Sequence, residues 1–387
     1  MKANAMNRSK VALVRCETYE DEDVLRAVRT GIDLLGGSGA FAQPGERIVL
    51  KPNVLVGVDP TKCVTTHPSV LRAVATLLKE AGANVSYGDS PSVGMCQLNL
   101  RRAGLKQVGD ELGIELAEFD TGRTVAHADA LLIKSFVVAN GVLDADALVS
   151  LPKLKTHPLT RFTGAVKNQF GCIPGVLKSR YHVKLPDPYH FATMLVDLNT
   201  LIRPRLAVMD GIVAMEGNGP RSGTPKALGV LLLSSDLIAL DATACRLIAL
   251  DPEFVPTSKP GEESGLGRYH EADIEIVGEP LESFYDPEFD AIRTAPAPCA
   301  GGRWKTFIKN RTCERPVIDE SKCTNCGTCV DMCPVSPRAV DWHSGDASRP
   351  PSHRYDWCIR CFCCQEVCPA GAITVQTPIL GRMFFRA

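Results

Sequence analysis

Short apolar runs alternate with amphipathic segments from residue 10 to about residue 250. The segments between the runs repeat apolar residues at helical spacing, and one has Pro68 at its start and Gly82 near its end, as helices prefer. Alternating strands and helices predict an α/β fold with a mainly parallel sheet and flanking helices. The predicted strands are KVALVR (10–15), RIVLKPN (47–53), NVSYGDSP (84–91), IELAEFD (114–120), DALVSLPKLKTH (146–157), RLAVMDG (205–211) and ALGVLLLSSD (227–236).

Polar side chains stand where these predicted strands end. In open α/β sheets, ligands bind outside the carboxyl ends of the strands. Lysines at three such positions would make the crevice cationic, which suits a carboxylate or a phosphate group. Each position alone is better explained by an ordinary solvated loop, but the set predicts a binding site. The strand-end residues are Lys51, Asn53, Asp89, Lys153, Lys155, His157 and Asp210.

Two further segments carry candidate site residues. FTGAVKNQFGCIPG (162–175) places Lys167 and Asn168 beside a predicted helix end. MDGIVAMEGNGPRSGTPK (209–226) is a glycine-rich loop between two predicted strands, long and polar enough to be a lid or an anion cradle. No dinucleotide or phosphate-loop glycine motif occurs, so a nicotinamide, flavin or nucleotide site has no support.

These observations define the predicted site. The substrate-binding residues are expected to be Lys51, Asn53, Asp89, Lys153, Lys155, Lys167, Asn168 and Asn218. The groups expected to supply protons are His157, Asp210 and Glu216. His157 precedes a proline, so an ordinary helix start would explain it without chemistry.

The sixteen cysteines are unevenly distributed, with nine of them between residues 323 and 368. Two runs, CTNCGTCVDMCP and CIRCFCCQEVCP, share the spacing C-x2-C-x2-C-x3-C followed by proline. Zinc sites favour separated cysteine pairs, and disulfide frameworks belong to secreted proteins, so both explanations fit less well. The other seven cysteines are scattered, and single cysteines of this kind are usually small buried hydrophobes.

Residues 315–378 resemble a bacterial two-cluster ferredoxin, in which the fourth cysteine of each run binds the other cluster. The resemblance implies a small α+β domain in which AVDW (339–342) and GAITV (371–375) form short strands. It also implies two [4Fe–4S] clusters, with Cys363 beside a cluster as a spare thiol. One cluster would bind Cys323, Cys326, Cys329 and Cys368, and the other Cys358, Cys361, Cys364 and Cys333.

The upstream motifs carry a second resemblance. They are VLKPN, TTHPSVLRAV, GDSP, SLPKLKTH, GAVKN, DGIVAMEGNGP and DATACRL. Together they resemble the bacterial and archaeal family catalogued as domain of unknown function 362, which is commonly fused to a C-terminal two-cluster ferredoxin. The resemblance implies an iron–sulfur protein with a redox role, but no substrate or catalytic residue. We expect an α/β domain at 1–285, a linker at 286–314, and a ferredoxin-type domain with its tail at 315–387.

Charge and hydropathy restrict the partners. The net charge of −1 gives no case for nucleic acid or an anionic membrane as the main partner. The longest apolar stretch, residues 227–250, is interrupted by Asp236 and Asp241, and the N-terminal residues do not form a secretory signal. We therefore expect a soluble, cytoplasmic protein without a membrane span.

The combined prediction is an iron–sulfur electron-transfer protein. It would be a ferredoxin-linked oxidoreductase that acts on a small anionic substrate in the α/β domain and exchanges electrons with a redox partner protein. Two alternatives remain: a non-enzymatic electron-transfer subunit that docks a partner enzyme, and a redox-sensing or assembly protein.

Overall fold

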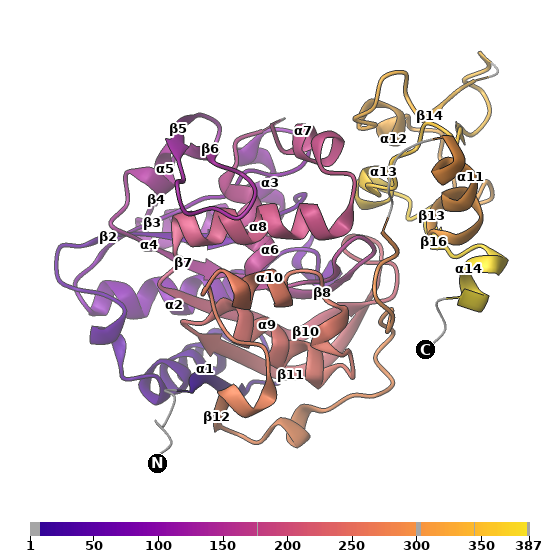
Figure 1. The fold of residues 1–387 in the computed structure, drawn as a ribbon. Coiled ribbons are helices and arrows are strands. Elements are labelled where there is room, and N and C mark those ends of the chain that lie inside the picture. The colour runs from indigo at the N-terminus through magenta and orange to yellow at the C-terminus, as the bar shows by residue number, and fades with distance from the viewer. Residues whose placement is uncertain (1–7, 176, 299–302, 344, 385–387) are drawn as a thin grey trace.

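The protein has a large α/β domain with a smaller cysteine-rich domain at one side (Figure 1). This computed structural model describes residues 8–175, 177–298, 303–343 and 345–384. None of the described helices is both long enough and apolar enough to cross a membrane.

The large domain is built around a ten-stranded sheet with the order β12-β1-β11-β10-β7-β2-β3-β4, from which β8 and β9 branch beside β10. The strands from β10 to β4 run parallel, whereas β11 is antiparallel to both of its neighbours. The predicted mainly parallel α/β fold is therefore confirmed. The strands are β1 (Ser9–Arg15), β2 (Arg47–Pro52), β3 (Asn84–Tyr87), β4 (Glu115–Leu116), β7 (Ala147–Leu151), β8 (Lys153–His157), β9 (Arg161–Thr163), β10 (Leu206–Glu216), β11 (Thr224–Ser234) and β12 (Ile274–Gly278).

Both faces of the sheet are buried. Along β1, Val11 and Leu13 belong to one hydrophobic core, whereas Ala12 and Val14 belong to the other. Burial on both faces explains why this strand is continuously apolar. One core includes side chains of α1 (Asp21–Leu34), α2 (Pro68–Glu80), α3 (Cys96–Arg102) and α4 (Leu105–Leu112). The other includes side chains of α5 (Asn140–Leu143), α6 (Ala165–Asn168), α8 (Pro188–Ile202), α9 (Leu237–Leu247) and the hairpin strand β6 (Ser135–Ala139).

Local sequence signals explain how several helices begin. Pro68 is the first residue of α2, as predicted, and the His67 side chain accepts a hydrogen bond from the Ser69 amide. Asp187 and Asp236 cap α8 and α9 by accepting backbone N–H groups with their carboxylates. The α-helices and strand of this domain not yet named are β5 (Gly122–Ala126), α7 (Leu177–Lys184) and α10 (Ser258–Glu263), and short 3-10 helices occur between the elements.

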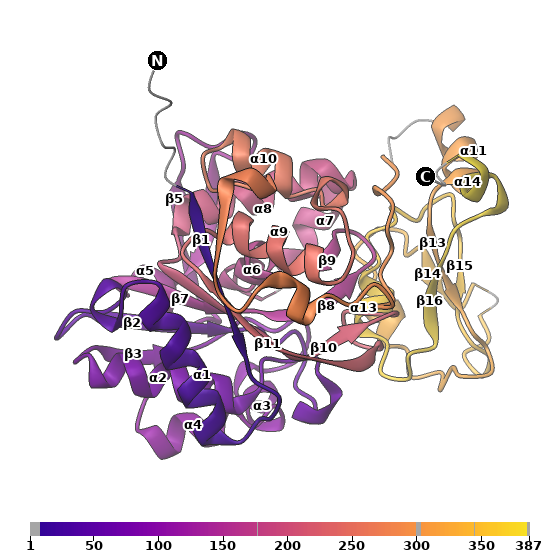
Figure 2. The ribbon, with the colours of Figure 1, turned by 90° about the horizontal axis from the view of Figure 1, so that it is seen from below.

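The segment predicted to be a lid or anion cradle is the distal part of a long β-hairpin. β10 and β11 continue to Glu216 and from Thr224, so residues 217–223 form the turn between them. Figure 2 shows this hairpin reaching towards α13 of the smaller domain. Its tip therefore lies where the two domains meet.

The smaller domain contains two short antiparallel strand pairs, β13 with β16 and β14 with β15. The predicted strands at 339–342 and 371–375 correspond to β14 and β16, so both are confirmed. Within the range expected to be a linker, the chain forms α11, which packs against α14. The elements are α11 (Arg303–Thr312), β13 (Arg315–Ile318), α12 (Thr328–Asp331), β14 (Val340–Asp341), β15 (Ser352–His353), α13 (Cys363–Val367), β16 (Ile373–Gln376) and α14 (Ile379–Phe384).

Candidate functional site

A cavity of about 380 Å³ lies between the carboxyl ends of β2 and β3 and the cysteine-rich domain. We call it the interdomain cavity. Its volume falls within the range that small-molecule sites occupy. The α/β domain contributes polar residues that include Lys51, Asn53, Asp89, Ser90, Lys167, Asn168, Lys178 and His182. The facing domain contributes Asp331, Met332, Cys333, Pro334, Cys363, Glu366 and Val367.

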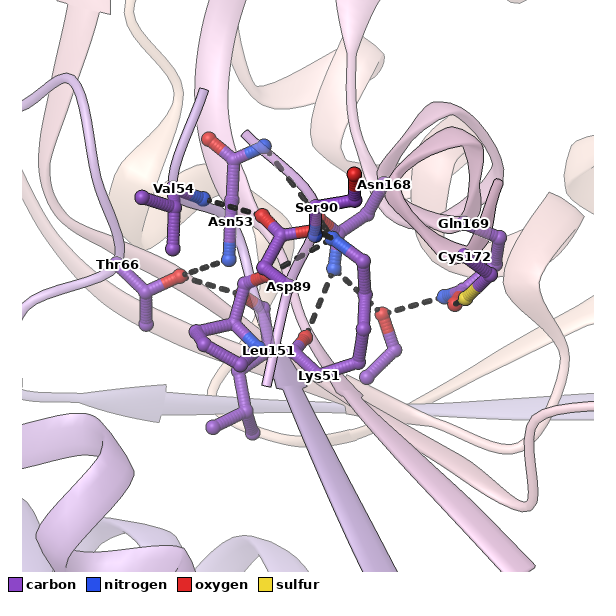
Figure 3. A network of polar contacts seen from close by, with 12 residues as sticks. Lys51, Asn53, Val54, Thr66, Asp89, Ser90, Leu151, Asn168, Gln169 and Cys172 are labelled. Atoms are coloured by element: carbon purple, nitrogen blue, oxygen red, sulfur yellow. Dashed lines mark hydrogen bonds and ion pairs between the residues drawn. The ribbon is translucent and has the colours of Figure 1, made fainter. Parts of the chain in front are cut away.

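One wall of the cavity is a buried ion pair. Lys51 Nζ lies 2.7 Å from Asp89 Oδ1 and donates a hydrogen bond to Asn168 Oδ1 at 2.9 Å (Figure 3). Asp89 Oδ2 accepts the Val54 amide at 2.8 Å. A Cβ on Gly171 would come within 2.0 Å of Asp89 Oδ1, so only glycine lets this turn approach the pair. The charge of Lys51 is thus compensated within the protein.

Two other lysines at the cavity form no ion pair with any described residue, although the carboxylates of Glu366 and Asp89 act on them electrostatically from farther away. Lys178 Nζ donates hydrogen bonds to Ser90 Oγ at 2.7 Å and to the Ile173 carbonyl at 3.0 Å, both neutral acceptors. Burial lowers the pKa of Lys178 to about 8. For Lys167, neither a hydrogen bond nor an ion pair forms with any described residue, and burial also lowers its pKa. Burial disfavours both cations and no carboxylate touches either, so this arrangement suits an anionic ligand that would pair with them directly.

A histidine beside these lysines has an unused ring nitrogen. His182 is buried and stacks on Phe191 with ring centroids 4.5 Å apart, and its Nδ1 has no hydrogen-bond partner among the described residues. Burial lowers its pKa to about 4, so the ring is neutral near pH 7. A buried polar atom without a partner indicates a place for a ligand or a water molecule.

Glu366 reaches the cavity from the opposite domain. Its Oε1 lies 2.9 Å from His157 Nε2. His157 Nδ1 accepts the amides of Leu159 and Thr160, so in the neutral ring the proton resides on Nε2, the nitrogen that lies beside the carboxylate. Burial lowers the pKa of His157 to about 4, which is consistent with a neutral ring. This contact joins the two domains at the edge of the cavity.

Several predicted site residues lie outside the cavity lining. Lys153 Nζ lies 2.8 Å from Asp210 Oδ2, and the Tyr19 hydroxyl bonds to both, in a network with no solvent exposure at Asp210. Lys155 donates to Asn53 Oδ1 and the Val64 carbonyl, each at 2.7 Å, and burial lowers its pKa well below its ordinary value. Lys155 therefore orients the side chain of Asn53, which lines the cavity, without lining the cavity itself.

The remaining two predicted residues belong to the long hairpin. Glu216 accepts the amide of Asp290 at 2.9 Å, and Asn218 donates to the Ile373 carbonyl at 3.0 Å. Of the eleven predicted site residues, the structure brings five to the cavity lining: Lys51, Asn53, Asp89, Lys167 and Asn168.

Sequence reasoning missed other cavity residues. Lys178 and His182 are four residues apart, a spacing that places side chains on one face of a helix, and this signal was present in the sequence. Glu366 had no such signal, because it lies in the cysteine-rich domain and meets the cavity only through the docking of the two domains.

The hairpin tip holds the two domains together. Arg221 donates to the Val367 carbonyl at 2.6 Å, and Gln365 Nε2 donates to Asn218 Oδ1 at 2.8 Å and to the Gly219 carbonyl at 2.9 Å. A second contact joins Arg161 to Glu314, with Nη1 and Oε2 2.8 Å apart. These contacts keep the cavity walls in register.

The cysteines of the smaller domain surround two small cavities. One is lined by Cys323, Cys326, Cys329 and Cys368, and the other by Cys333, Cys358, Cys361 and Cys364. Four thiols around one largely apolar space are the donor set that 4Fe–4S clusters take, so the residues fit such a group. Cys363 lines neither of these and faces the interdomain cavity instead. Cys333 lines both its own cavity and the interdomain cavity.

The scattered cysteines are a separate group. As expected for small hydrophobes, those that the structure describes are buried, whereas Cys299 lies outside the described residues. The buried positions are Cys16, Cys63, Cys96, Cys172, Cys245 and Cys313.

Comparison with known families identifies two regions. Residues 48–246, just over half of the chain, match the family described as "Domain of unknown function (DUF362)". Residues 315–369 match the family described as "4Fe-4S dicluster domain". Both matches confirm the resemblances carried by the sequence motifs, including the fusion of the two domains.

Individual relatives cover different parts of the chain. A thylakoid-associated protein of Synechocystis sp. is 39% identical over 257 residues, which are 66% of this chain and 79% of that protein. Pyruvate synthase subunit PorD of Methanocaldococcus jannaschii is 34% identical over 73 residues, which are 19% of this chain and 71% of that subunit. The lactate racemase apoprotein of Thermoanaerobacterium thermosaccharolyticum has a TM-score of 0.41 at 10% identity. That match covers 64% of this chain and 59% of the racemase chain.

Proposed function

We propose that this chain, which belongs to the DUF362 family and ends in a 4Fe-4S dicluster domain, is a ferredoxin-linked oxidoreductase that reduces a small anionic molecule in the interdomain cavity. Its ferredoxin-type domain supports iron–sulfur electron transfer. The observation that carries the proposal is the meeting of two lysines that lack an ion pair among the described residues with a cysteine-containing wall in one cavity.

The eight cysteines fit two [4Fe–4S] clusters, with one tetrad for each. When bound, the clusters would supply one-electron transfer. Cys333 lines the interdomain cavity, so its tetrad is the one beside the substrate. Cys326, in the other tetrad, is exposed to solvent. We infer that electrons arrive at the Cys326 side from a reduced one-electron carrier protein and leave at the Cys333 side.

The cavity lysines would hold the substrate. An anionic group bound between Lys167 and Lys178 would give both lysines the direct ionic partner that no described residue provides. The unused Nδ1 of His182 would add a directional hydrogen bond. Apolar neighbours such as Phe170 and Val367 would exclude water from the rest of the molecule.

A two-electron reduction also consumes two protons, and the carrier protein would deliver the two electrons in two single steps. The ammonium groups of Lys167 and Lys178 are candidate proton donors, because burial lowers the pKa of each. Residues 153–157, with Asp210, would support the site from below without touching the substrate.

The test uses the intact protein, purified without oxygen and reduced with dithionite that is then removed. Low-molecular-mass fractions of cell extract are added while the visible absorbance of the reduced protein is followed. We expect re-oxidation by one such fraction, lost in Lys167→Met and Lys178→Met. The variant Lys259→Met is the matched control, since this lysine is 77% exposed on α10.

A second candidate function is a non-enzymatic electron-transfer subunit. The likeness of the C-terminal domain to pyruvate synthase subunit PorD favours it. Re-oxidation by protein fractions alone, unaffected by the cavity lysines, would support this second function and exclude the first.

A further inference from the structure

The outer end of the cysteine-rich domain exposes large apolar side chains on two adjacent helices. On α11, Phe307 is 55% and Ile308 58% exposed. On α14, Ile379 is 78% and Leu380 41% exposed. We call these four side chains, with the arginines around them, the outer face. Figures 1 and 2 both show α11 and α14 side by side, remote from the central sheet.

The outer face is a built surface, because its elements are packed together. A Cβ on Gly381 would come within 2.1 Å of the Thr312 carbonyl, so α14 approaches α11 as closely as only glycine permits. On its other side, α11 is held to the chain beyond it. Asn310 donates to Asp356 at 2.7 Å, and Lys309 donates to the Cys358 carbonyl at 3.0 Å.

Arginines stacked on aromatic rings surround the apolar side chains. Arg311 lies 3.5 Å from the ring centroid of Phe307, and Arg354 lies 4.7 Å from that of Trp357, which is 38% exposed. Arg315, which is half-buried, lies over the ring of Tyr355, whereas Arg360 stacks on the same ring but is only 1% exposed and does not contribute to the surface. Such stacks place a cation at the rim of an apolar surface.

Acidic groups offset only part of this charge. Glu314 is paired with Arg161 of the large domain, whereas Asp356 is bonded to the neutral Asn310 amide and keeps its negative charge beside the exposed Arg311 and Arg354. The outer face is therefore locally cationic, although the net charge of the whole chain is −1. Net charge is a sum over the molecule and conceals a patch of this kind.

We propose that the outer face binds the surface of an anionic lipid bilayer. Protruding Phe, Ile and Leu side chains would enter the boundary between headgroups and acyl chains, and the arginines would meet anionic headgroups. A bilayer accepts protruding apolar side chains of any shape, whereas a protein partner must provide hollows that match them. The amphipathic Trp357 and Tyr355 also suit the headgroup level.

The test is co-sedimentation of the intact, cluster-loaded protein with vesicles under anaerobic conditions. Vesicles of phosphatidylcholine with phosphatidylglycerol are compared with vesicles of phosphatidylcholine alone. We expect binding to the anionic vesicles only, and weaker binding as salt rises, because salt screens the charges. The double variant Phe307→Ser/Ile379→Ser and the variant Arg311→Glu should each bind about fivefold or more weakly.

Leu131→Ser is the matched control, because Leu131 is 48% exposed but lies in the other domain. This variant should bind vesicles as the unchanged protein does. Iron content and visible absorbance report whether each variant is folded. Equal binding of the double variant, or equal binding to neutral vesicles, would overturn the proposal. The proposal would also fail if the outer face joined two copies of the chain, which sedimentation velocity would show as a dimer of the unchanged protein that the double variant no longer forms. It would fail as well if the double variant no longer captured an acidic protein but still bound vesicles.

Discussion

Two groups of lysines surround the carboxyl ends of the central strands, and they differ in what they touch. Lys51 and Lys153 each contact a buried carboxylate at 2.7 and 2.8 Å, and Lys155 is bonded to an amide and a carbonyl. Lys167 and Lys178 contact no carboxylate among the described residues, although both line the interdomain cavity. The lysines of the first group stabilise the fold, whereas the ammonium groups of the second group remain able to pair with an anionic ligand. Ion pairing separates Lys51 and Lys153 from Lys167 and Lys178, whereas Lys155, which also has only neutral acceptors, differs from Lys178 in lying outside the cavity lining.

The largest effect should come from breaking a paired lysine. Lys153→Met leaves Asp210 fully buried without its counterion, and we expect a loss of about 3–5 kcal/mol in the free energy of unfolding. Urea denaturation of the protein, followed by the circular dichroism of its helices, measures this loss. Adding Asp210→Asn should recover part of the loss, whereas a loss below about 1 kcal/mol would show that the pair is not structural.

Crowding a paired lysine should have a smaller effect. The Cβ of Gly171→Ala would lie 2.0 Å from Asp89 Oδ1 and 2.7 Å from Lys51 Nζ, so the turn must move away from the pair. We expect a destabilisation of about 1–3 kcal/mol by the same denaturation assay. Gly39→Ala is the control, because nothing lies within 4 Å of its Cβ position. Equal behaviour of the two variants would contradict the close approach.

Removing an unpaired lysine should spare the fold and weaken ligand binding. For Lys178→Met we expect no loss of stability, because no carboxylate is left unpaired. Affinity for a carboxylate or phosphate probe should fall about tenfold, equivalent to about 1.4 kcal/mol. Isothermal titration measures the affinity, and Lys259→Met should leave it unchanged. If Lys178→Met destabilised the protein as strongly as Lys153→Met, the proposed distinction between the two groups would be lost.

The smallest effect is a pH dependence of the same binding. Burial lowers the pKa of Lys178 from its ordinary value of 10.5 to about 8, and an anion binds the protonated form. Affinity for a carboxylate, whose own charge is constant above pH 6, should therefore be full below pH 8 and fall as pH rises through 8. Titrations between pH 6.5 and 9.5 test this. The affinity of Lys178→Met should depend less on pH than that of the unchanged protein. If the two proteins showed the same pH dependence, a group other than Lys178 would be responsible for it.

Much of the fold was predictable, because it follows from local periodicity. Apolar runs such as KVALVR correspond to strands buried on both faces, and Pro68 begins its helix as expected. The division of cysteines was also predictable, since the spacing of the two runs matches the two tetrads that line separate cavities. Helix α11 was not predicted, because its sequence RWKTFIKNRT is polar and has no strong apolar periodicity.

The candidate site was predictable only in its location. Strand-end polarity pointed to Lys51, Asn53 and Asp89, which line the cavity, and equally to Lys153 and Lys155, which do not. The expected glycine-rich lid is a hairpin tip bonded to the other domain, because residues 213–216 and 224–227 continue the strand pairing. Composition likewise did not predict a cationic surface. The net charge of −1 is a sum over the whole chain, so it does not reveal a local excess of arginines such as that of the outer face.

The sequence by itself determined most of the central strands, several helices, the family and the two cysteine runs, because these depend on residues close together in the chain. Strands β5, β6, β9 and β12 were not predicted, and the strand predicted at 146–157 divides into β7 and β8. The division of the cysteines into tetrads came from the resemblance to ferredoxins. The tertiary structure decided which lysines are paired and which remain available. Lys153 meets Asp210 across 57 positions, and Glu366 meets His157 across 209, so those pairings exist only after the sheet has formed and the domains have docked. The charge of a buried lysine is a property of its neighbours in space.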